Sequence, residues 1–191
     1  MNNNQKTFLI LSQFFWPEYF RINELATELS KNYNLKVITS IPNYPDGKFY
    51  KGYSKFNKRN EIYNNMIINR VFTYPRKNSS AINLFLNYVT FNIFSYLQLR
   101  RHKQKIDCIF IPATSPMTQA LAAILLKKKF KCKIIIWVQD IFPESFYLKK
   151  KKLKNFSYFF NYIAKYILNN CDRIFLQNYE MNKYIARYVN D

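Results

Sequence analysis

The sequence predicts one α/β domain built on a Rossmann-like, doubly wound parallel sheet. Short apolar runs alternate with helical spacings along the whole chain, a pattern typical of β-α-β units and parallel sheets. A chain of 191 residues, 49% of them hydrophobic, supports one core rather than two. Since no internal repeat or flexible linker interrupts this pattern, the domain is expected to comprise residues 1–191.

Six segments are predicted to be strands because they are short, apolar and rich in β-branched or aromatic residues. They are Thr7–Ser12, Leu35–Ser40, Ile67–Tyr74, Cys108–Ile111, Ile134–Val138 and Ile174–Leu176. The fifth of these, with the sequence IIIWV, is apolar throughout, which is typical of a strand buried on both faces.

Five segments between and after these strands are predicted to be helices. They are Arg21–Asn32, a long segment after Ser80, Pro116–Lys127, Leu153–Asn169 and Met181–Val189. In the first, Ile22, Leu25 and Leu29 recur at helical spacing. The third has a good start at Ser115 and Pro116, because serine caps early helical amides and proline is tolerated at the first position.

Ligands of open parallel sheets bind outside the carboxyl ends of the strands. This rule selects four loops as candidate site segments: Gln13–Asn23, Ile41–Gly52, Pro112–Gln119 and Gln139–Ser145. The chain has only 11 acidic residues, and Glu18, Asp46, Asp140 and Glu144 all fall in these loops. Asp140 closely follows the most apolar strand, where a carboxylate either accepts a proton from a substrate hydroxyl or caps the next turn.

Several function classes lack the residues that they need. Gly47 and Gly52 are the only glycines and share one loop, which excludes GxGxxG and P-loop nucleotide binding. The sole histidine, His102, lies in a basic segment and is expected to be solvated, so Ser-His-Asp and histidine-metal chemistry lack their parts. No metal site is therefore expected.

The cysteines point to a reducing compartment. Cys108, Cys132 and Cys171 are widely spaced and fit neither a disulfide framework nor a CxxC metal site. The N-terminal residues do not form the apolar region of a signal peptide. A cytoplasmic location is the expectation.

The net charge is strongly positive. Lys and Arg total 30, giving +19, and such a charge attracts polyanions such as nucleic acid, anionic lipid or phosphorylated substrates. Part of it is also accounted for by AT-rich coding, which favours Lys together with Asn, Ile, Phe and Tyr. A non-enzymatic binder of nucleic acid or of an anionic membrane is an alternative, although no RNA-binding signature is present and no specific nucleic-acid partner is expected.

Five segments together carry a resemblance to a known family. They are SQFFWPEYFRINELATEL (12–29), TSIPNYPDGKFYKGY (39–53), LNYVTF (86–91), TSPMTQALAAI (114–124) and WVQDIFPES (137–145). In this order they resemble the N-terminal, acceptor-side domain of family 4 glycosyltransferases. The greatest similarity is to the WbuB-like bacterial subfamily, which builds surface polysaccharides such as capsule, O-antigen and exopolysaccharide.

The resemblance implies half of a two-domain GT-B enzyme. Such enzymes transfer a sugar from a nucleotide-diphosphate sugar with retention of configuration and without a bound metal or other cofactor. The donor is held mainly by the C-terminal domain, which this chain would lack, so the isolated chain is expected to be inactive. A separate donor-binding chain, a longer gene product and a truncated inactive remnant all remain open.

The resemblance also implies where the acceptor binds. Glu18, Arg21 and Asn23 match the family's loop after the first strand, although Tyr19 and Phe20 stand where many relatives have glycines. The other matching positions are Asn43 and Tyr44, Thr114 and Ser115, and Asp140 and Glu144. Asp140 is the candidate catalytic participant, and a lipid-linked saccharide is the expected acceptor.

Ala81 to Leu99 forms an uncharged stretch nearly long enough to span a bilayer. Its polar residues Asn83, Asn87, Thr90 and Gln98 cluster on one side, and a spanning helix would separate the flanking strands, so an interfacial or a core-packed helix is expected. Basic residues that could face an anionic membrane are Arg100, Arg101, Lys103 and Lys149, Lys150, Lys151 and Lys152. Peripheral contact with the inner face of the plasma membrane is therefore an expectation.

Overall fold

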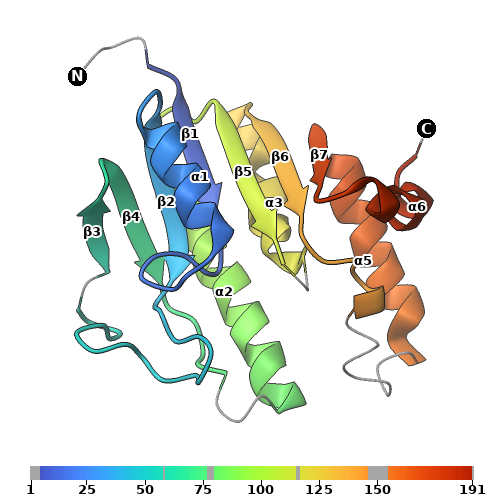
Figure 1. The fold of residues 1–191 in the computed structure, drawn as a ribbon, viewed down its shortest axis with the longest axis horizontal. Helices are drawn as coiled ribbons and strands as arrows, with labels where there is room; N and C mark the ends of the chain where they lie inside the picture. Colours follow the sequence, from blue (N-terminus) through green and yellow to red (C-terminus); the bar gives the residue numbers. More distant parts are fainter. Residues whose placement is uncertain (1–4, 58, 77–79, 115–116, 146–154, 191) are drawn as a thin grey trace.

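The computed structural model describes residues 5–57, 59–76, 80–114, 117–145 and 155–190. They form one seven-stranded sheet with the order β3-β4-β2-β1-β5-β6-β7 (Figure 1). The strands are β1 (Thr7–Leu11), β2 (Asn34–Ser40), β3 (Asn60–Tyr63), β4 (Met66–Val71), β5 (Cys108–Ala113), β6 (Lys133–Val138) and β7 (Arg173–Leu176). All neighbouring strands are parallel except β3 and β4. The predicted α/β, Rossmann-like fold is confirmed.

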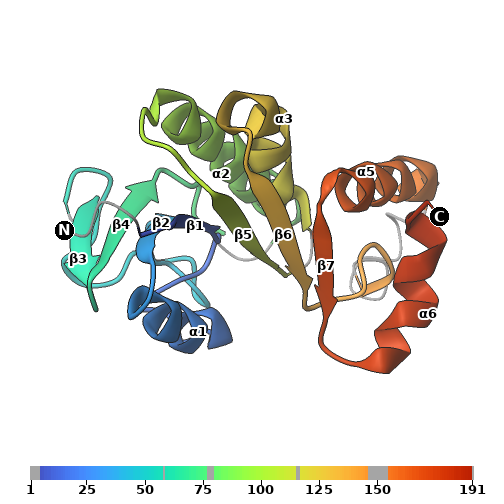
Figure 2. The same cartoon turned by 90° about the horizontal axis from the view of Figure 1, so that it is seen from above.

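Helices cover both faces of the sheet. One face carries α2 (Ala81–Arg101), α3 (Ala120–Phe130) and α5 (Ser157–Asn170), and the other carries α1 (Arg21–Ser30) (Figure 2). The short α6 (Asn182–Ile185) lies beyond β7 at one end of the sheet. Apolar side chains of the strands alternate between two buried clusters, one beneath each helical layer. This arrangement leaves the carboxyl ends of the parallel strands at one edge, the lower edge in Figure 1.

The structure differs from the sequence prediction at β3. This strand pairs antiparallel with β4 through a turn at Asn64 and Asn65, whose φ angles are 45° and 61°. Its four residues, NEIY, show little apolar alternation, and an Asn-Asn pair is a weaker hairpin signal than Asn-Gly. The third predicted strand is also shorter than expected, because β4 ends at Val71 rather than Tyr74.

Two predicted helices begin or end differently. The helix predicted at Pro116–Lys127 starts as a 3₁₀ turn, Met117–Gln119, and continues as α3 to Phe130, where Lys131 adopts φ 49°. The helix predicted at 181–189 is α6 flanked by 3₁₀ turns. The proposed start at Ser115 and Pro116, and the first two residues of the helix predicted at Leu153–Asn169, lie outside the described residues.

A buried arginine connects four loops and strands at the carboxyl edge. Arg70 of β4 is 2% exposed and forms an ion pair with Glu61 of β3. Its guanidinium also donates to the Ser40 carbonyl (3.2 Å) at the end of β2 and to the Trp16 carbonyl (2.6 Å) after β1. The ring of Tyr53 covers it, with the guanidinium carbon 4.9 Å from the centroid. Arg70 therefore holds the loops after β1 and β2 against the edge hairpin.

We predict that Arg70→Met destabilises the fold. The substitution leaves the Glu61 carboxylate and two buried carbonyls without their cation, which typically costs about 3 kcal/mol or more. Lys31→Met is the matched control, because it removes an exposed ion pair with Glu28 that typically contributes less than about 1 kcal/mol. Urea unfolding followed by circular dichroism measures both; equal losses would contradict the role given to Arg70.

Candidate functional site

Side chains from three elements form a polar floor beneath the carboxyl edge. The backbone N–H of Gln13 donates to Gln119 Oε1 (3.0 Å), and Gln119 Nε2 donates to the Pro112 carbonyl (2.6 Å). Gln13 Nε2 donates to Asn87 Oδ1, while Asn87 Nδ2 donates to the Tyr74 carbonyl (2.6 Å). Because Gln13, Asn87 and Gln119 are all buried, the loops after β1, β4 and β5 share one fixed base.

Glu18 is buried (2% exposed) and supports the loop after β2. Its Oε1 accepts the backbone N–H groups of Asn43 and Tyr44, both at 2.7 Å. Burial raises the pKa of Glu18, and these two hydrogen bonds and the nearby Arg70 only partly oppose the rise. Glu18 therefore holds the backbone of this loop in place through these two hydrogen bonds.

Asn23 and Asn43 each donate to a backbone carbonyl of these two loops. Asn23 Nδ2 donates to the Glu18 carbonyl (2.6 Å), and Asn43 Nδ2 donates to the Ile41 carbonyl (2.7 Å). Asn43 is 2% exposed. Two of the sequence-predicted acceptor-binding residues, Glu18 and Asn43, thus shape these loops from within, whereas Asn23 is partly buried and also lines a pocket along α1.

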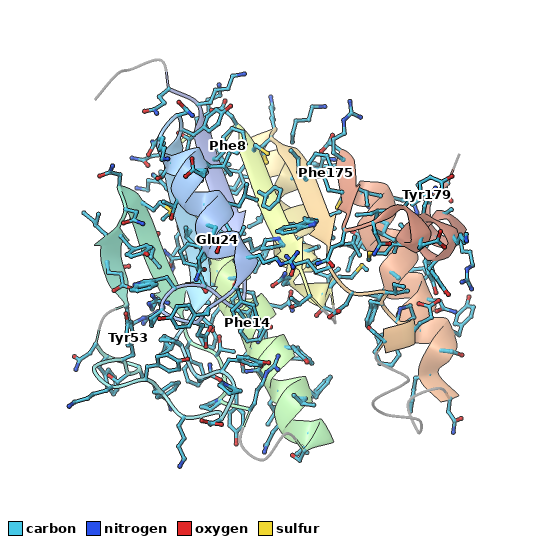
Figure 3. All side chains as sticks on the ribbon, viewed as in Figure 1. Phe8, Phe14, Glu24, Tyr53, Phe175 and Tyr179 are labelled. Carbon is cyan, nitrogen blue, oxygen red and sulfur yellow. The ribbon has the colours of Figure 1, made fainter. Side chains whose placement is uncertain are left out.

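An aromatic cradle surrounds one cation above the floor. We use this name for Phe14, Phe20, Tyr44 and Tyr88 around Arg76. The Arg76 guanidinium carbon lies 4.8 Å from the Phe14 ring centroid, 5.9 Å from Tyr44 and 5.4 Å from Tyr88. Phe14 and Phe20 stack at 5.0 Å, and Tyr44 meets both at 5.4 Å. Phe14 is labelled at this lower edge in Figure 3, whereas Phe8 lies at the opposite edge.

Asp140 acts electrostatically on one ring of the cradle. It follows β6 and is partly buried, and its negative charge adds to the effect of burial in raising the pKa of Tyr88. Arg76 opposes that rise with its positive charge. The negative charge of Asp140 and the positive charge of Arg76 therefore act on Tyr88 in opposite directions, so both charges influence the same part of the carboxyl edge.

Glu144 is directed toward the C-terminal segment. Its Oε1 accepts from the Tyr188 hydroxyl (3.1 Å) and lies 4.0 Å from Arg187 Nη1. Thr114 is partly buried and directly follows Ala113, the last residue of β5. The prediction for Ser115 falls outside the described residues.

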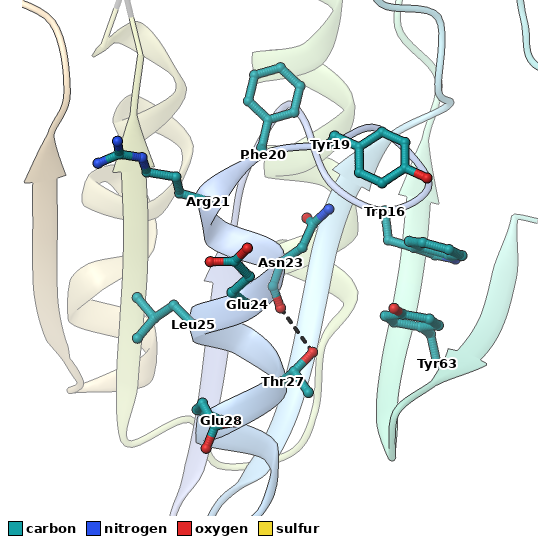
Figure 4. Close-up of a pocket in the computed structure, with 10 residues that line it drawn as sticks. All are labelled: Trp16, Tyr19, Phe20, Arg21, Asn23, Glu24, Leu25, Thr27, Glu28 and Tyr63. Carbon is teal, nitrogen blue, oxygen red and sulfur yellow. Dashed lines mark hydrogen bonds between the residues drawn. The ribbon is translucent and has the colours of Figure 1, made fainter.

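A pocket of about 650 Å³ opens along α1 (Figure 4). The stacked rings of Trp16 and Tyr63, 4.3 Å apart, form one wall, and Arg21 and Glu24 project from the first turns of α1. Phe20 lines this pocket and also belongs to the aromatic cradle, so the two surfaces adjoin. Arg21 is exposed, as a ligand-contacting residue requires.

Sequence reasoning did not select Arg76, Tyr88, Phe14 or Phe20 as site residues. Arg76 follows the third predicted strand, and the rule of strand carboxyl ends applied there would have found it. The aromatic residues gave no such signal, because aromatic residues occur throughout this chain at buried and exposed positions alike.

The basic residues expected to face a membrane lie away from the cradle. Arg100, Arg101 and Lys103 are exposed at the C-terminal end of α2, near the amino edge of the sheet, while Lys149 to Lys152 lie outside the described residues. His102 between them is not solvated as expected. It is partly buried, with its ring 6.2 Å from Phe130, and burial lowers its pKa.

The cysteines are free thiols in apolar surroundings. Burial raises the pKa of Cys108 and of Cys171 to about 12, so both are unreactive at neutral pH. Within the described ranges, no group of His, Cys, Asp or Glu side chains is arranged to hold a metal ion. Among the helices of that same part of the chain, none has both the length and the apolarity needed to cross a membrane.

No protein-family profile matches the sequence. No curated protein matches it either. The fold is similar to that of a sucrose-phosphate synthase from Thermosynechococcus elongatus, with a TM-score of 0.66 and 12% sequence identity. The similarity covers 97% of this chain and 45% of that protein, so the chain spans less than half the length of that enzyme. The neighbour is a glycosyltransferase of the GT-B type, and the similarity shows a GT-B-like, Rossmann-like fold.

We predict that Glu18→Ala and Glu18→Gln have different effects. Alanine leaves the buried N–H groups of Asn43 and Tyr44 without an acceptor, which costs about 2 kcal/mol or more, whereas the glutamine amide oxygen can still accept. Urea unfolding of both variants checks this difference. Equal stability of the two variants would show that Glu18 does not support the loop.

The pH dependence provides a second test of the same residue. Because the pKa of Glu18 is raised from 4.5 in the folded state, the folded chain binds this proton more tightly than the unfolded chain. Its contribution to the free energy of unfolding is therefore fully present below pH 4.5 and falls as pH rises through the folded pKa. Glu18→Gln should remove this part of the pH dependence.

Proposed function

We propose that this chain is the acceptor-binding part of a glycosyltransferase. The observation that carries the proposal is the Arg76 cation among the aromatic rings of Phe14, Tyr44 and Tyr88 at the carboxyl edge of the sheet, where the charge of Asp140 also acts on Tyr88. Ligands of this fold class bind at that edge. The similarity to a GT-B-type enzyme supports the reaction class.

The cradle offers the contacts that a lipid-linked saccharide needs. Aromatic faces pack against the apolar faces of sugar rings and against prenyl chains. Arg76 donates from Nε to Asn87 Oδ1 (3.3 Å), and a guanidinium carries four further N–H bonds that suit a diphosphate. We propose that Arg76 binds the acceptor's diphosphate and that the rings hold its first sugar.

Asp140 is the proposed catalytic participant. A carboxylate at this position would accept the proton of the attacking acceptor hydroxyl, or orient that hydroxyl. Arg21 in the adjoining pocket and Thr114 after β5 complete the proposed acceptor wall, with Tyr44 from the loop that Glu18 supports. Ser115 and Glu144 remain sequence-based proposals.

The sugar donor would bind a second domain. We propose a nucleotide-diphosphate sugar as donor, transferred with retention of configuration, in the synthesis of a bacterial surface polysaccharide of the WbuB-like type. The matched enzyme is more than twice as long as this chain, which leaves room for such a domain there. It would belong to a longer polypeptide or to a separate partner chain.

We predict that Arg76→Gln weakens acceptor binding. Loss of a charge-assisted contact to a phosphate costs about 1.5–3 kcal/mol, equivalent to roughly a tenfold or greater loss of affinity. Isothermal titration calorimetry with a short-chain prenyl diphosphate saccharide measures it on the chain alone. Arg173→Gln, at the start of β7 and at the other edge, is the matched control. Equal affinity of Arg76→Gln and wild type would overturn the proposed site.

The role of Asp140 is tested in an enzyme that combines this chain with a donor-binding domain. The chain alone should give no donor-dependent transfer, and transfer should require a donor-binding domain. In that complete enzyme, Asp140→Asn should abolish product formation while leaving acceptor affinity and the circular dichroism spectrum unchanged. Near-normal turnover by the variant would show that Asp140 has no part in the reaction.

The outward face of α2 supports a second proposal, peripheral contact with an anionic membrane on its cytoplasmic side. Ile82, Phe85 and Ile93 are 68%, 63% and 51% exposed and form one stripe that ends at Arg100. The polar Asn87 lies on the inner side (1% exposed). Phe91 and Leu99 of α2 are both 0% exposed in the core, so α2 has the core-packed position of the two left open by the sequence; the proposal is that its outward stripe also contacts lipid.

The neighbouring helices extend this face. Leu125 of α3 and Phe159 and Tyr162 of α5 are 64%, 57% and 64% exposed, and α2, α3 and α5 contain no acidic residue. Lys128 and Lys129 add exposed positive charge at the end of α3. Such a face suits anionic lipid, since each basic residue near the surface contributes about 1 kcal/mol of attraction.

We predict that the chain floats with vesicles that contain phosphatidylglycerol and not with neutral vesicles. The double variant Phe85→Ser/Ile93→Asn should lose this association, whereas Ile62→Asn, which changes an equally exposed residue on β3 (79%), should retain it. Flotation in a sucrose gradient at low and high salt measures both. No flotation, or flotation independent of lipid charge, would contradict the proposal.

A further inference from the structure

A second pocket, of about 360 Å³, lies at the amino edge of the sheet, where β2 and β4 begin and α2 ends. Its lining contains three cationic side chains, the imidazole of His102 and amide side chains that include Gln104. The cations are Lys36, Arg101 and Lys103, and none of the lining residues is acidic. This composition favours an anionic ligand.

Lys36 is the buried charge of this pocket. It is 7% exposed, donates from Nζ to Gln104 Oε1, and forms no ion pair with any carboxylate among the described residues. Burial without a counter-charge lowers its pKa. Arg70 at the other edge is equally buried but has Glu61 as its partner. An anion would give Lys36 the counter-charge that the protein does not supply.

His102 contributes a second unsatisfied group. Its Nε2 is buried and has no hydrogen-bond partner in the part of the chain that the structure describes. Burial lowers the pKa of His102, and the positive charges of Lys36 and Lys129 lower it further. The nearby carboxylate of Asp107 is engaged elsewhere, with Lys105 Nζ (2.8 Å) and the Thr7 N–H (2.9 Å).

We propose that this pocket binds a phosphate group. Lys36 and Arg101 would donate to its oxygens, Lys103 would add positive charge, and His102 would donate from Nε2 once protonated. The site lies at the opposite edge of the sheet from the aromatic cradle, so it is separate from the proposed acceptor site. Its phosphate would come from a soluble anion or from a lipid headgroup at the end of α2.

The single histidine of the chain gives a direct readout, because one imidazole Hε1 resonance reports His102 alone. A pH titration by proton NMR is run at constant ionic strength in chloride, with inorganic phosphate, and with sulfate, whose charge stays constant. A bound dianion beside the ring should raise the pKa of His102 by about 1 unit or more, and the shift should saturate with anion concentration. A water-soluble short-chain phosphatidic acid forms the lipid arm.

The variants distinguish phosphate binding in this pocket from non-specific screening of the protein's charge by the added anion. Lys36→Met should fold at least as stably as wild type, because it removes an unpaired buried charge, and should lose the response to phosphate. Arg101→Gln should weaken the response, whereas Lys183→Gln, far along the chain on α6, should leave it unchanged.

Each outcome decides the proposal. A response to inorganic phosphate and sulfate indicates a soluble anion, and a response to the phosphatidic acid alone indicates a lipid headgroup. If no arm differs from chloride, or if Lys36→Met responds like wild type, the phosphate site is excluded. None of these results depends on acceptor binding or sugar transfer.

Discussion

Arg70 brings a full positive charge into the interior between β2 and β3, and the loops of the carboxyl edge are arranged around it. Its partners are a carboxylate on β3 and carbonyls that follow β1 and β2. The same charge lies near Glu18, which in turn holds the backbone of Asn43 and Tyr44. This series of buried polar contacts holds Tyr44 in the aromatic cradle. The cradle depends on these contacts because its loops contain little regular secondary structure of their own.

The buried cations at the two edges of the sheet have different partners. At the carboxyl edge, Arg70 and Glu61 neutralise each other, and the partly buried cation Arg76 packs against aromatic rings. At the amino edge, Lys36 has an amide partner and no carboxylate within the described residues. A counter-charge offsets much of the desolvation cost of a buried ion, whereas a buried ion without one costs free energy that a ligand of opposite charge can recover.

The sequence was sufficient to predict the fold because alternating strand and helix patterns are local. It predicted that Tyr44 and Asp140 follow strands at the carboxyl edge, where the structure has them, since strand ends follow from the same pattern. It could not show that Glu18 and Asn43 point inward, because side-chain direction in a loop depends on contacts with distant residues. Arg70 was missed for a related reason: an arginine inside a strand pattern gives no sign that β3 supplies its carboxylate.

The outward apolar stripe of α2 follows from the contacts on its inner side. The sequence predicts one polar and one apolar side for this helix, but the side that faces the sheet carries the buried apolar residues Phe91 and Leu99 together with Asn87. Asn87 accepts from Gln13 and Arg76 and donates to the Tyr74 carbonyl, so it must face the sheet. Fixing Asn87 inward turns Ile82, Phe85 and Ile93 outward. One helix therefore links the two proposals, because the contacts that build the acceptor site also create the apolar face offered to the membrane.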